Sequence, residues 1–269
     1  MTLPVFAAGV PATTASPVTV FALSGAHTGD LLLALPAIGA ALEWGGVMVS
    51  GLAPRYYAAL THLPLRYLHA PTAGALLRPQ WRAGQHRTEA WLDALPGRPR
   101  PARVPIPVHG LARARELLPG EAWALLSPWA DFPGKRWHAA GWRAVAEGLV
   151  ELGYRVALVG PPKAATMARE IASPSITDLT GRDTPQSWPA LLARAALVVS
   201  TDTASVHMAD ALGIPVVGLY GYTRIAEFGP FWQRGHCVEA DGMDAIGAEA
   251  VLAACAGIHR SRMRIATAP

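Results

Sequence analysis

Several residue types are scarce in this sequence, and each shortage excludes a class of protein. Cys237 and Cys255 are the only two cysteines among 269 residues, too few for a disulfide framework or a multi-cysteine metal site. Charged residues make up 16% of the chain and hydrophobic residues 51%, the reverse of a disordered composition. The composition therefore predicts a folded chain of one large or two small domains, and the few cysteines suit a reducing cytoplasm.

Long apolar runs are also missing. A membrane-spanning helix needs roughly 20 consecutive apolar residues, whereas the best stretch here, 31–42, is shorter and contains Pro36. The N-terminus has no basic region followed by an apolar stretch, which argues against a secretory signal. We therefore expect a cytoplasmic protein without a membrane span.

Lysine is limited to Lys135 and Lys163, so arginine supplies nearly all of the positive charge, and it does so unevenly. Residues 1–119 carry ten arginines against five acidic residues, a net charge of +5, whereas residues 120–269 have a net charge of −1. Eight of the arginines lie within 78–115. This excess predicts an anionic partner: a phosphorylated substrate, an acidic lipid surface or a nucleic acid. A solvated arginine-rich surface without a partner is an equally weighted alternative.

Short β-rich runs alternate with helical periodicity in both halves of the chain, a pattern typical of α/β proteins with parallel sheets. The pattern weakens over 71–107, where we expect an irregular region with a single helix. The expected strands are 18–23, 47–49, 65–68, 123–126, 154–159, 197–199 and 215–219, and the expected helices are 31–43, 55–60, 88–95, 112–118, 139–152, 164–171, 185–194 and 205–212. Such sheets bind ligands at the carboxyl ends of their strands.

Polar residues gather at three junctions between a predicted strand and the segment after it. In the first, 24–30 (SGAHTGD), the glycines allow a tight turn and Asp30 stands at a helix start, where a simple N-cap is the favoured alternative to a functional role. In the second, 127–137 (SPWADFPGKRW), Lys135 and Arg136 suit a phosphate. A solvated surface loop explains the second junction equally well.

The third junction, 200–207 (STDTASVH), is denser in functional groups than a helix cap needs. Hydroxyls and free N–H groups at a helix N-terminus form an anion site, and Asp202 can accept hydrogen bonds from sugar hydroxyls. The alternative is N-capping by Asp202 or Thr203, with His207 on the helix surface. We favour a ligand site at this junction.

Six segments, taken in order, resemble those of a known family. They are 29–37 (GDLLLALPA), 133–137 (PGKRW), 178–181 (DLTG), 191–195 (LLARA), 202–207 (DTASVH) and 213–221 (GIPVVGLYG). Each is weak alone, but their order and spacing resemble those of glycosyltransferase family 9, the bacterial ADP-heptose:lipopolysaccharide heptosyltransferases. The resemblance covers about residues 20–60 and 120–235.

The resemblance implies a GT-B fold: two Rossmann-like α/β domains with parallel sheets and a cleft between them. The expected domains are a shortened acceptor-side domain over 1–119 and a nucleotide-sugar-binding domain over 120–269. The implied reaction is inverting and metal-independent transfer of a sugar. The expected sugar is heptose, and the expected donor is ADP-heptose. The acceptor would be the lipopolysaccharide core or a smaller molecule, and the Arg-rich first part would suit peripheral contact with the inner membrane.

The resemblance also implies roles for individual residues. Asp30 would be the general base, and Lys135 would balance the charge of the departing diphosphate. No metal and no cofactor is implied. The expected donor-binding residues are Ser127, Asp131, Lys135, Arg136, Asp202, Thr203, Ala204 and His207, and the expected acceptor-side residues are His27 and Gly29.

Two positions depart from the family pattern, with Ala204 in place of a glycine and Asp131 in place of a small hydroxyl residue. The family's acidic ribose contact has no clear match in 161–163. These departures motivate an alternative, a catalytically degenerate protein that binds a sugar nucleotide or serves as an assembly subunit. A third hypothesis, glycosylation of a nucleic-acid base, has only the basic first part in its favour, because no nucleic-acid-binding motif is present.

Overall fold

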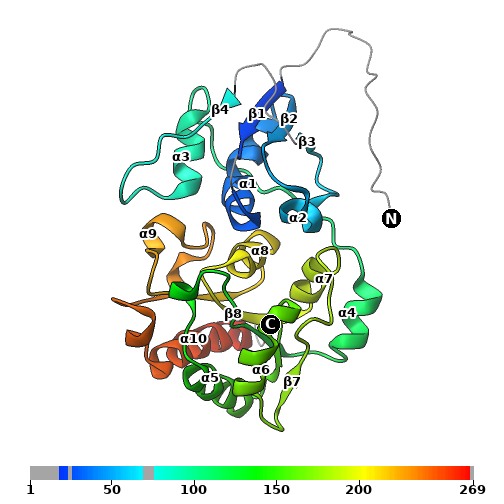
Figure 1. The fold of residues 1–269 in the computed structure, drawn as a ribbon, viewed down its shortest axis with the longest axis vertical. Helices are drawn as coiled ribbons and strands as arrows, with labels where there is room; N and C mark the ends of the chain where they lie inside the picture. The colour runs from blue at the N-terminus through cyan, green and yellow to red at the C-terminus, as the bar shows by residue number, and fades with distance from the viewer. Residues whose placement is uncertain (1–17, 24–25, 69–75, 267–269) are drawn as a thin grey trace.

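The computed structural model describes residues 18–23, 26–68 and 76–266. Two parallel sheets are arranged one above the other along the long axis of the molecule (Figure 1). The N-terminal sheet has the order β3-β2-β1-β4, and its strands are β1 (Val18–Ala22), β2 (Gly46–Ser50), β3 (Arg66–Leu68) and β4 (Leu76–Leu77). The C-terminal sheet has the order β10-β9-β8-β5-β6-β7, and its strands are β5 (Trp123–Ser127), β6 (Arg155–Leu158), β7 (Ile176–Asp178), β8 (Ala195–Thr201), β9 (Val216–Tyr220) and β10 (Val238–Glu239).

Helices connect and cover the strands, and every strand pairing described is parallel, which confirms the α/β class. The helices are α1 (Thr28–Leu42), α2 (Pro54–Tyr57), α3 (Arg87–Ala94), α4 (Leu111–Leu117), α5 (Ala139–Glu151), α6 (Ala165–Ile171), α7 (Trp188–Ala193), α8 (Ala204–Leu212), α9 (Ile225–Phe228) and α10 (Ala248–Ala266). Strands β5 and β8 are buried along their whole length, as expected for strands covered on both faces.

Each sheet reverses its strand order at one point. In the C-terminal sheet β6 and β7 extend from β5 in one direction, while β9 and β10 extend from β8 in the other. In the N-terminal sheet the reversal lies between β1 and β4. Ligands of open α/β sheets bind in the crevice at such switch points, outside the carboxyl ends of the strands. The topology therefore predicts two crevices, one for each sheet.

Helix α1 joins the two halves. Its residues from Leu31 to Ala41 are all buried, because a helix that is apolar on every side is stable only when packed on all sides. It packs against α3 on one side and α8 on the other. Side chains of α1 and α8 belong to one continuous core, so the two crevices are held in a defined position relative to each other.

The structure contains four elements that the sequence patterns did not predict: the short strands β4, β7 and β10 and the long helix α10. The segment 71–107 contains β4 as well as the expected helix, although part of it lies outside the described residues. The basic C-terminal end of the described chain belongs to α10, which packs on α5. There Arg262 donates to the Ala196 carbonyl at 2.7 Å and His259 lies against Tyr154. In the part of the chain described, no helix combines the length and apolarity needed to cross a membrane.

Two helical glycines test the packing of α1. A Cβ on Gly39 would lie 2.4 Å from the Ala102 carbonyl oxygen, whereas a Cβ on Gly257 of α10 would meet nothing within 4 Å. Alanine is the better helix former, so Gly257→Ala should stabilise the protein by up to about 1 kcal/mol. Gly39→Ala should instead destabilise it by about 1–3 kcal/mol through overpacking. Urea unfolding of both variants measures the difference, and stabilisation by Gly39→Ala would contradict the close approach.

Candidate functional site

A cavity of about 610 Å³ lies at the carboxyl ends of β8, β5 and β6, closed on one side by the start of α1. Ten of the eleven residues expected at the site line it, from both halves of the chain: His27, Gly29, Asp30, Ser127, Asp131, Lys135, Asp202, Thr203, Ala204 and His207. Arg136 is the exception. We refer to this space as the donor cavity, after the donor-binding residues that the family resemblance leads us to expect there.

Arg136 shapes the loop after β5 instead of lining the donor cavity. Its Nε donates to the Ala130 carbonyl at 2.7 Å, and its guanidinium group stacks on the Trp129 ring at 3.9 Å. Next to it, Asp131 pairs with Lys163 at 2.5 Å. The hydrogen bond from Lys163 is the main reason that the pKa of Asp131 lies below its usual value.

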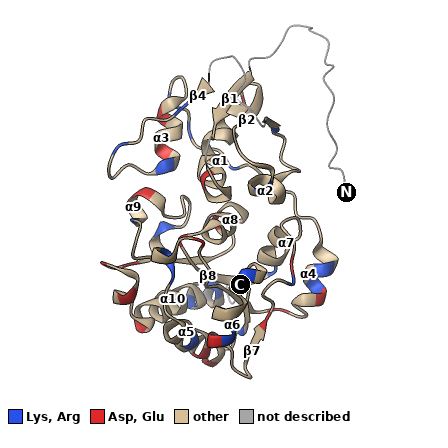
Figure 2. Ribbon diagram, viewed as in Figure 1, with Lys and Arg blue, Asp and Glu red and all other residues tan. Residues whose placement is uncertain are grey.

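A second cavity, of about 520 Å³, lies at the carboxyl ends of β1 and β4. We refer to it as the N-terminal cavity. Two arginines from the basic segment, Arg78 and Arg87, line it together with Trp81. Figure 2 shows basic positions at the end of α3 that faces α9 and in the loop beside it, and acidic positions elsewhere on α3. Basic and acidic positions are mixed over the C-terminal half. Asp30 and Phe228 line both cavities, so they stand where the two crevices meet.

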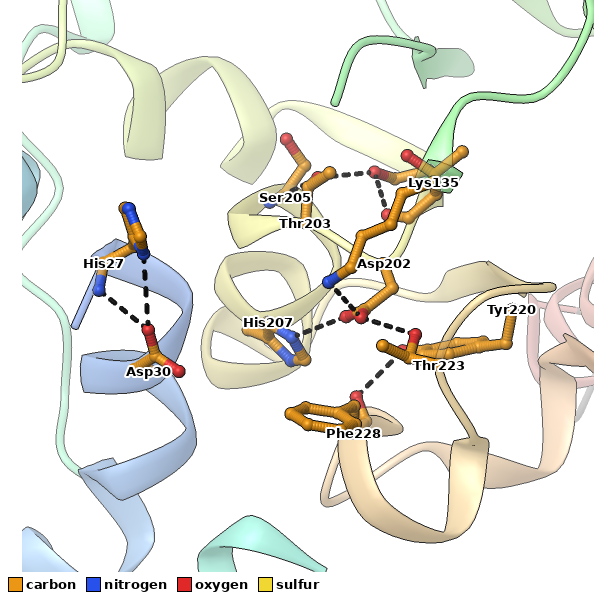
Figure 3. A network of polar contacts seen from close by, with 12 residues as sticks. His27, Asp30, Lys135, Asp202, Thr203, Ser205, His207, Tyr220, Thr223 and Phe228 are labelled. Atoms are coloured by element: carbon orange, nitrogen blue, oxygen red, sulfur yellow. Dashed lines mark hydrogen bonds and ion pairs between the residues drawn. The ribbon is translucent and has the colours of Figure 1, made fainter. Parts of the chain in front are cut away.

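The carboxylate of Asp202 organises the floor of the donor cavity (Figure 3). Its Oδ2 accepts hydrogen bonds from Lys135 Nζ at 2.6 Å and from Thr223 Oγ1 at 2.7 Å, and its Oδ1 lies 3.2 Å from His207 Nε2. These partners come from the loop after β5, the loop after β9 and α8. Asp202 is only 4% exposed, whereas Lys135 is 25% exposed and reaches into the cavity.

These contacts keep Asp202 ionised although it is buried. Burial alone would raise the pKa of Asp202, but the hydrogen bond and charge of His207 and the charge of Lys135 outweigh burial and lower that pKa to about 2. An opposite charge within hydrogen-bond distance stabilises a carboxylate in this way. The network therefore holds Lys135 in one position at the edge of the cavity.

The N-terminus of α8 opens onto the same cavity. Thr203 is the N-cap and accepts from the Ser205 N–H at 3.4 Å. Ser127, at the end of β5, lies within hydrogen-bond distance of Ser205 across the switch point, with 2.9 Å between the hydroxyl oxygens. In the described part of the chain nothing accepts from the Ala204 N–H, which the helix dipole makes a favourable position for an anion.

Two of the structural interpretations drawn from the sequence were wrong. Asp30 is not the N-cap of its helix; His27 is, and Asp30 occupies the third helical position, where its Oδ2 accepts from the His27 N–H at 2.7 Å. Its other carboxylate oxygen has no partner among the described residues, and the side chain is 46% exposed. His207 does not lie on the exposed surface of α8. Its side chain is buried and faces Asp202.

Sequence analysis missed several residues around the two cavities. Thr223 follows β9 and was not singled out, although the same search for polar residues at strand ends would have found it. Asp183 follows β7, a strand too short to be predicted. Arg78 belongs to the arginine-rich region singled out from the sequence, but its place at the end of β4, another strand too short to be predicted, was not foreseen. No sequence pattern around Phe228 indicates that it lines a cavity. In the described residues no group of three or more His, Cys, Asp or Glu side chains is arranged to hold a metal ion.

Removing the charge of Asp202 should cost far more stability than removing that of Asp131. Asp202→Asn leaves Lys135 without its buried partner and should lower the free energy of unfolding at pH 7 by about 3 kcal/mol. Asp131→Asn breaks an ion pair between side chains that are 55% and 72% exposed, so its effect should stay below about 1 kcal/mol. Chemical denaturation of both variants measures this, and equal small losses would show that Asp202 does not organise the cavity floor.

The comparisons with known proteins agree with this architecture. The profile of glycosyltransferase family 9 (heptosyltransferase) matches residues 89–246. Lipopolysaccharide heptosyltransferase 3 of Escherichia coli is 33% identical over 110 residues, which are 39% of this chain and 32% of that protein. Lipooligosaccharide heptosyltransferase 2 of Haemophilus influenzae is 35% identical over 104 residues, 36% of this chain and 30% of that protein. The matched regions thus span about a third of the length of these relatives.

Solved structures show the same fold over nearly the whole chain. A glycosyltransferase family 9 protein from Veillonella parvula superposes with a TM-score of 0.76 at 14% identity, covering 92% of this chain and 98% of that one. The ADP-heptose LPS heptosyltransferase II of E. coli gives a TM-score of 0.72 at 14% identity, covering 91% and 99%. The expected GT-B architecture of two Rossmann-like domains is confirmed. The chain belongs to glycosyltransferase family 9, whose profile matches more than half of its length.

Proposed function

We propose that this protein is an inverting, metal-independent glycosyltransferase that moves a sugar from a nucleotide-sugar donor to an acceptor hydroxyl. The position of Asp30 carries the proposal, since it lines the donor cavity and the N-terminal cavity at once. A transferase must bring two substrates together at one point, and a carboxylate at that point can take a proton from the attacking group. The family relatives named as heptosyltransferases support ADP-heptose as the donor, heptose as the transferred sugar and a lipopolysaccharide core as the acceptor.

On the donor side, the diphosphate would lie between the N-terminus of α8 and Lys135. The N–H groups of Thr203 and Ala204 and the dipole of α8 would stabilise its negative charge. Asp202 would act through Lys135 and His207, which it holds at 2.6 and 3.2 Å. Asp202 is thus a positioning residue in this proposal, since its oxygens are already occupied within the protein.

The chemical step would be a single displacement. The free oxygen of the Asp30 carboxylate takes the proton of the acceptor hydroxyl while the hydroxyl oxygen attacks the anomeric carbon. The bond from that carbon to the diphosphate oxygen breaks on the opposite face, so the configuration inverts. Lys135 and the start of α8 balance the charge that develops on the leaving diphosphate.

On the acceptor side, the N-terminal cavity suits an anionic molecule with a flat or cyclic portion. Arg87 lies between the rings of Trp81 and Phe228, with its guanidinium carbon 4.5 and 4.7 Å from their centroids, and Arg78 lines the same wall. Guanidinium groups bind phosphate and carboxylate with two parallel hydrogen bonds. A lipopolysaccharide core would present such groups, and transfer of a sugar to this acceptor would place the protein in the cytoplasm, in peripheral contact with the inner membrane surface.

The departure from the family pattern at Asp131 has a local compensation. Lys163 pairs with Asp131 at 2.5 Å, so its negative charge need not oppose a diphosphate in the donor cavity. This pairing weakens one of the reasons for a binding-only protein, the main alternative to a transferase. Sugar-nucleotide binding without turnover in the wild-type protein would nevertheless establish that alternative.

Asp30→Asn should reduce the rate of sugar transfer by about 10²–10⁴-fold, the typical contribution of a general base. Asparagine can still accept from the His27 N–H, so the start of α1 and the donor affinity should be retained. Turnover and donor binding are measured together, with Glu43→Gln at the exposed C-terminal end of α1 as the matched control. Near-normal turnover of Asp30→Asn would remove Asp30 as the base.

Arg87→Gln should weaken binding of an anionic acceptor with little change in donor affinity. The loss of one charge-assisted hydrogen-bond partner should raise the acceptor KM by about tenfold or more. Arg113→Gln is the matched control, because Arg113 pairs with Glu116 on α4 and lines neither cavity. If the acceptor KM of Arg87→Gln equals that of the wild type, the N-terminal cavity is not the acceptor site.

A further inference from the structure

Among the described residues, three line both cavities and so border the point where the two substrates would meet. They are Asp30 and Leu33, one turn apart on α1, and Phe228 at the end of α9. Leu33 is 4% exposed and belongs to the buried side of α1, whereas Phe228 is half-buried. Phe228 therefore presents an accessible apolar ring at the meeting point, opposite in character to the carboxylate of Asp30.

The ring of Phe228 is close to a cation of each cavity. The guanidinium carbon of Arg87, in the N-terminal cavity, lies 4.7 Å from the ring centroid, and Lys135 Nζ, in the donor cavity, lies 5.9 Å from it. Figure 3 shows the Phe228 side chain below His207. An anionic acceptor held at Arg87 and a diphosphate held at Lys135 would therefore bring their reacting groups together beside this ring.

Hydrogen bonds hold α9 in place, since none of its four residues is fully buried. In the C-terminal half, the Tyr220 hydroxyl donates to the Phe228 carbonyl at 3.1 Å. Burial raises the pKa of Tyr220 well above its usual value, so this hydroxyl keeps its proton. Toward the N-terminal half, the Gly84 N–H donates to Glu227 Oε1 at 2.6 Å. Helix α9 is thus attached to both halves of the chain.

The residue after Phe228 is fixed as well. The Thr88 N–H donates to His86 Nδ1 at 3.2 Å, which leaves His86 Nε2 to donate to the Gly229 carbonyl at 2.9 Å. Burial is the main reason that the pKa of His86 falls to about 4. The ring is therefore neutral at pH 7 and keeps this arrangement. Phe228 has a defined position from the anchors on either side of it.

A base at the meeting point does not by itself distinguish the acceptor from water. The side chain of Asp30 is 46% exposed, so its carboxylate can take a proton from a water molecule as well as from an acceptor hydroxyl. The water oxygen would then attack the anomeric carbon, and the bond from that carbon to the diphosphate oxygen would break. The donor would be lost as free sugar and nucleoside diphosphate, unless the site leaves no place for water.

Phe228 is positioned to exclude that water. Its ring has no donor or acceptor for a water molecule, and together with Leu33 it gives the meeting point an apolar surface beside Asp30. We propose that Phe228 keeps water from the reacting carbon and thereby directs the sugar to the acceptor. This inference rests on the proposed function, since it presupposes transfer from a nucleotide-sugar donor.

Transfer and hydrolysis of ADP-heptose, measured in one mixture with a lipopolysaccharide core that lacks heptose, test the inference. Phe228→Ala makes room for water beside Asp30, so its ratio of hydrolysis to transfer should exceed that of the wild type by about tenfold or more. Phe228→Leu keeps a bulky apolar side chain and should stay within about threefold of the wild-type ratio. Both variants should retain ADP affinity in calorimetry, because the proposed diphosphate contacts do not involve Phe228.

Phe132→Ala is the matched control. Phe132 is an aromatic residue of the donor cavity that is 49% exposed and does not line the N-terminal cavity. Its ring packs against Tyr222, with 4.6 Å between the ring centroids. Removing it makes no room beside Asp30, so the ratio of hydrolysis to transfer should equal that of the wild type.

The possible failures are distinct. A loss of transfer and hydrolysis in equal proportion in Phe228→Ala, or an equal shift of the ratio in Phe132→Ala, would overturn the role of Phe228 and leave a transferase. A wild type that hydrolyses ADP-heptose as fast as it transfers the sugar would overturn that role even if Phe228→Ala does not fold. Turnover of ADP-heptose by neither route, in the wild type and in Phe228→Ala, would overturn both this inference and the proposed function.

Discussion

The site depends first on one buried carboxylate. Asp202 is 4% exposed, and an isolated charge at that depth would be strongly unfavourable. It is tolerated because three segments that are distant in the sequence each supply a partner: Lys135 after β5, His207 in α8 and Thr223 after β9. The need to satisfy Asp202 therefore holds together the loops that form the floor of the donor cavity, and it fixes the position of Lys135, which lines that cavity.

The second constraint is the packing of α1 between the two sheets. Because α1 is apolar on all sides, it is buried against α3 and α8, and its first turn lies beside the first turn of α8, where a Cβ on Gly29 would lie 3.5 Å from the His207 ring. The crevices of the two sheets thus meet at Asp30. A chain with two separate ligand sites would need no such contact, whereas a transferase must bring its two substrates to one point.

Sequence patterns predicted most long elements because their signals are local. The apolar run of β8 and the helical periodicity of α5 each require burial whatever surrounds them. The two-residue β4 and the three-residue β7 have no such signal and form only as additions to existing neighbours. Missing them also concealed Asp183, which follows β7, and the strand-end position of Arg78, which follows β4. Helix α10 was missed as well, and its packing on α5 is a tertiary contact between distant segments.

The sequence by itself determined the α/β class, the polar strand ends and a set of residues of which all but Arg136 line one cavity. The α/β class and the polar strand ends follow from residue type and spacing, which act locally. The set of site residues follows from those strand ends together with the resemblance to the family. Tertiary structure decided what each residue faces. It placed Asp30 at the third position of its helix, buried His207 beside Asp202, and turned Arg136 onto Trp129. The reason is physical: burial, pairing and pKa are set by the neighbours that folding brings together, and those neighbours are far apart in the chain.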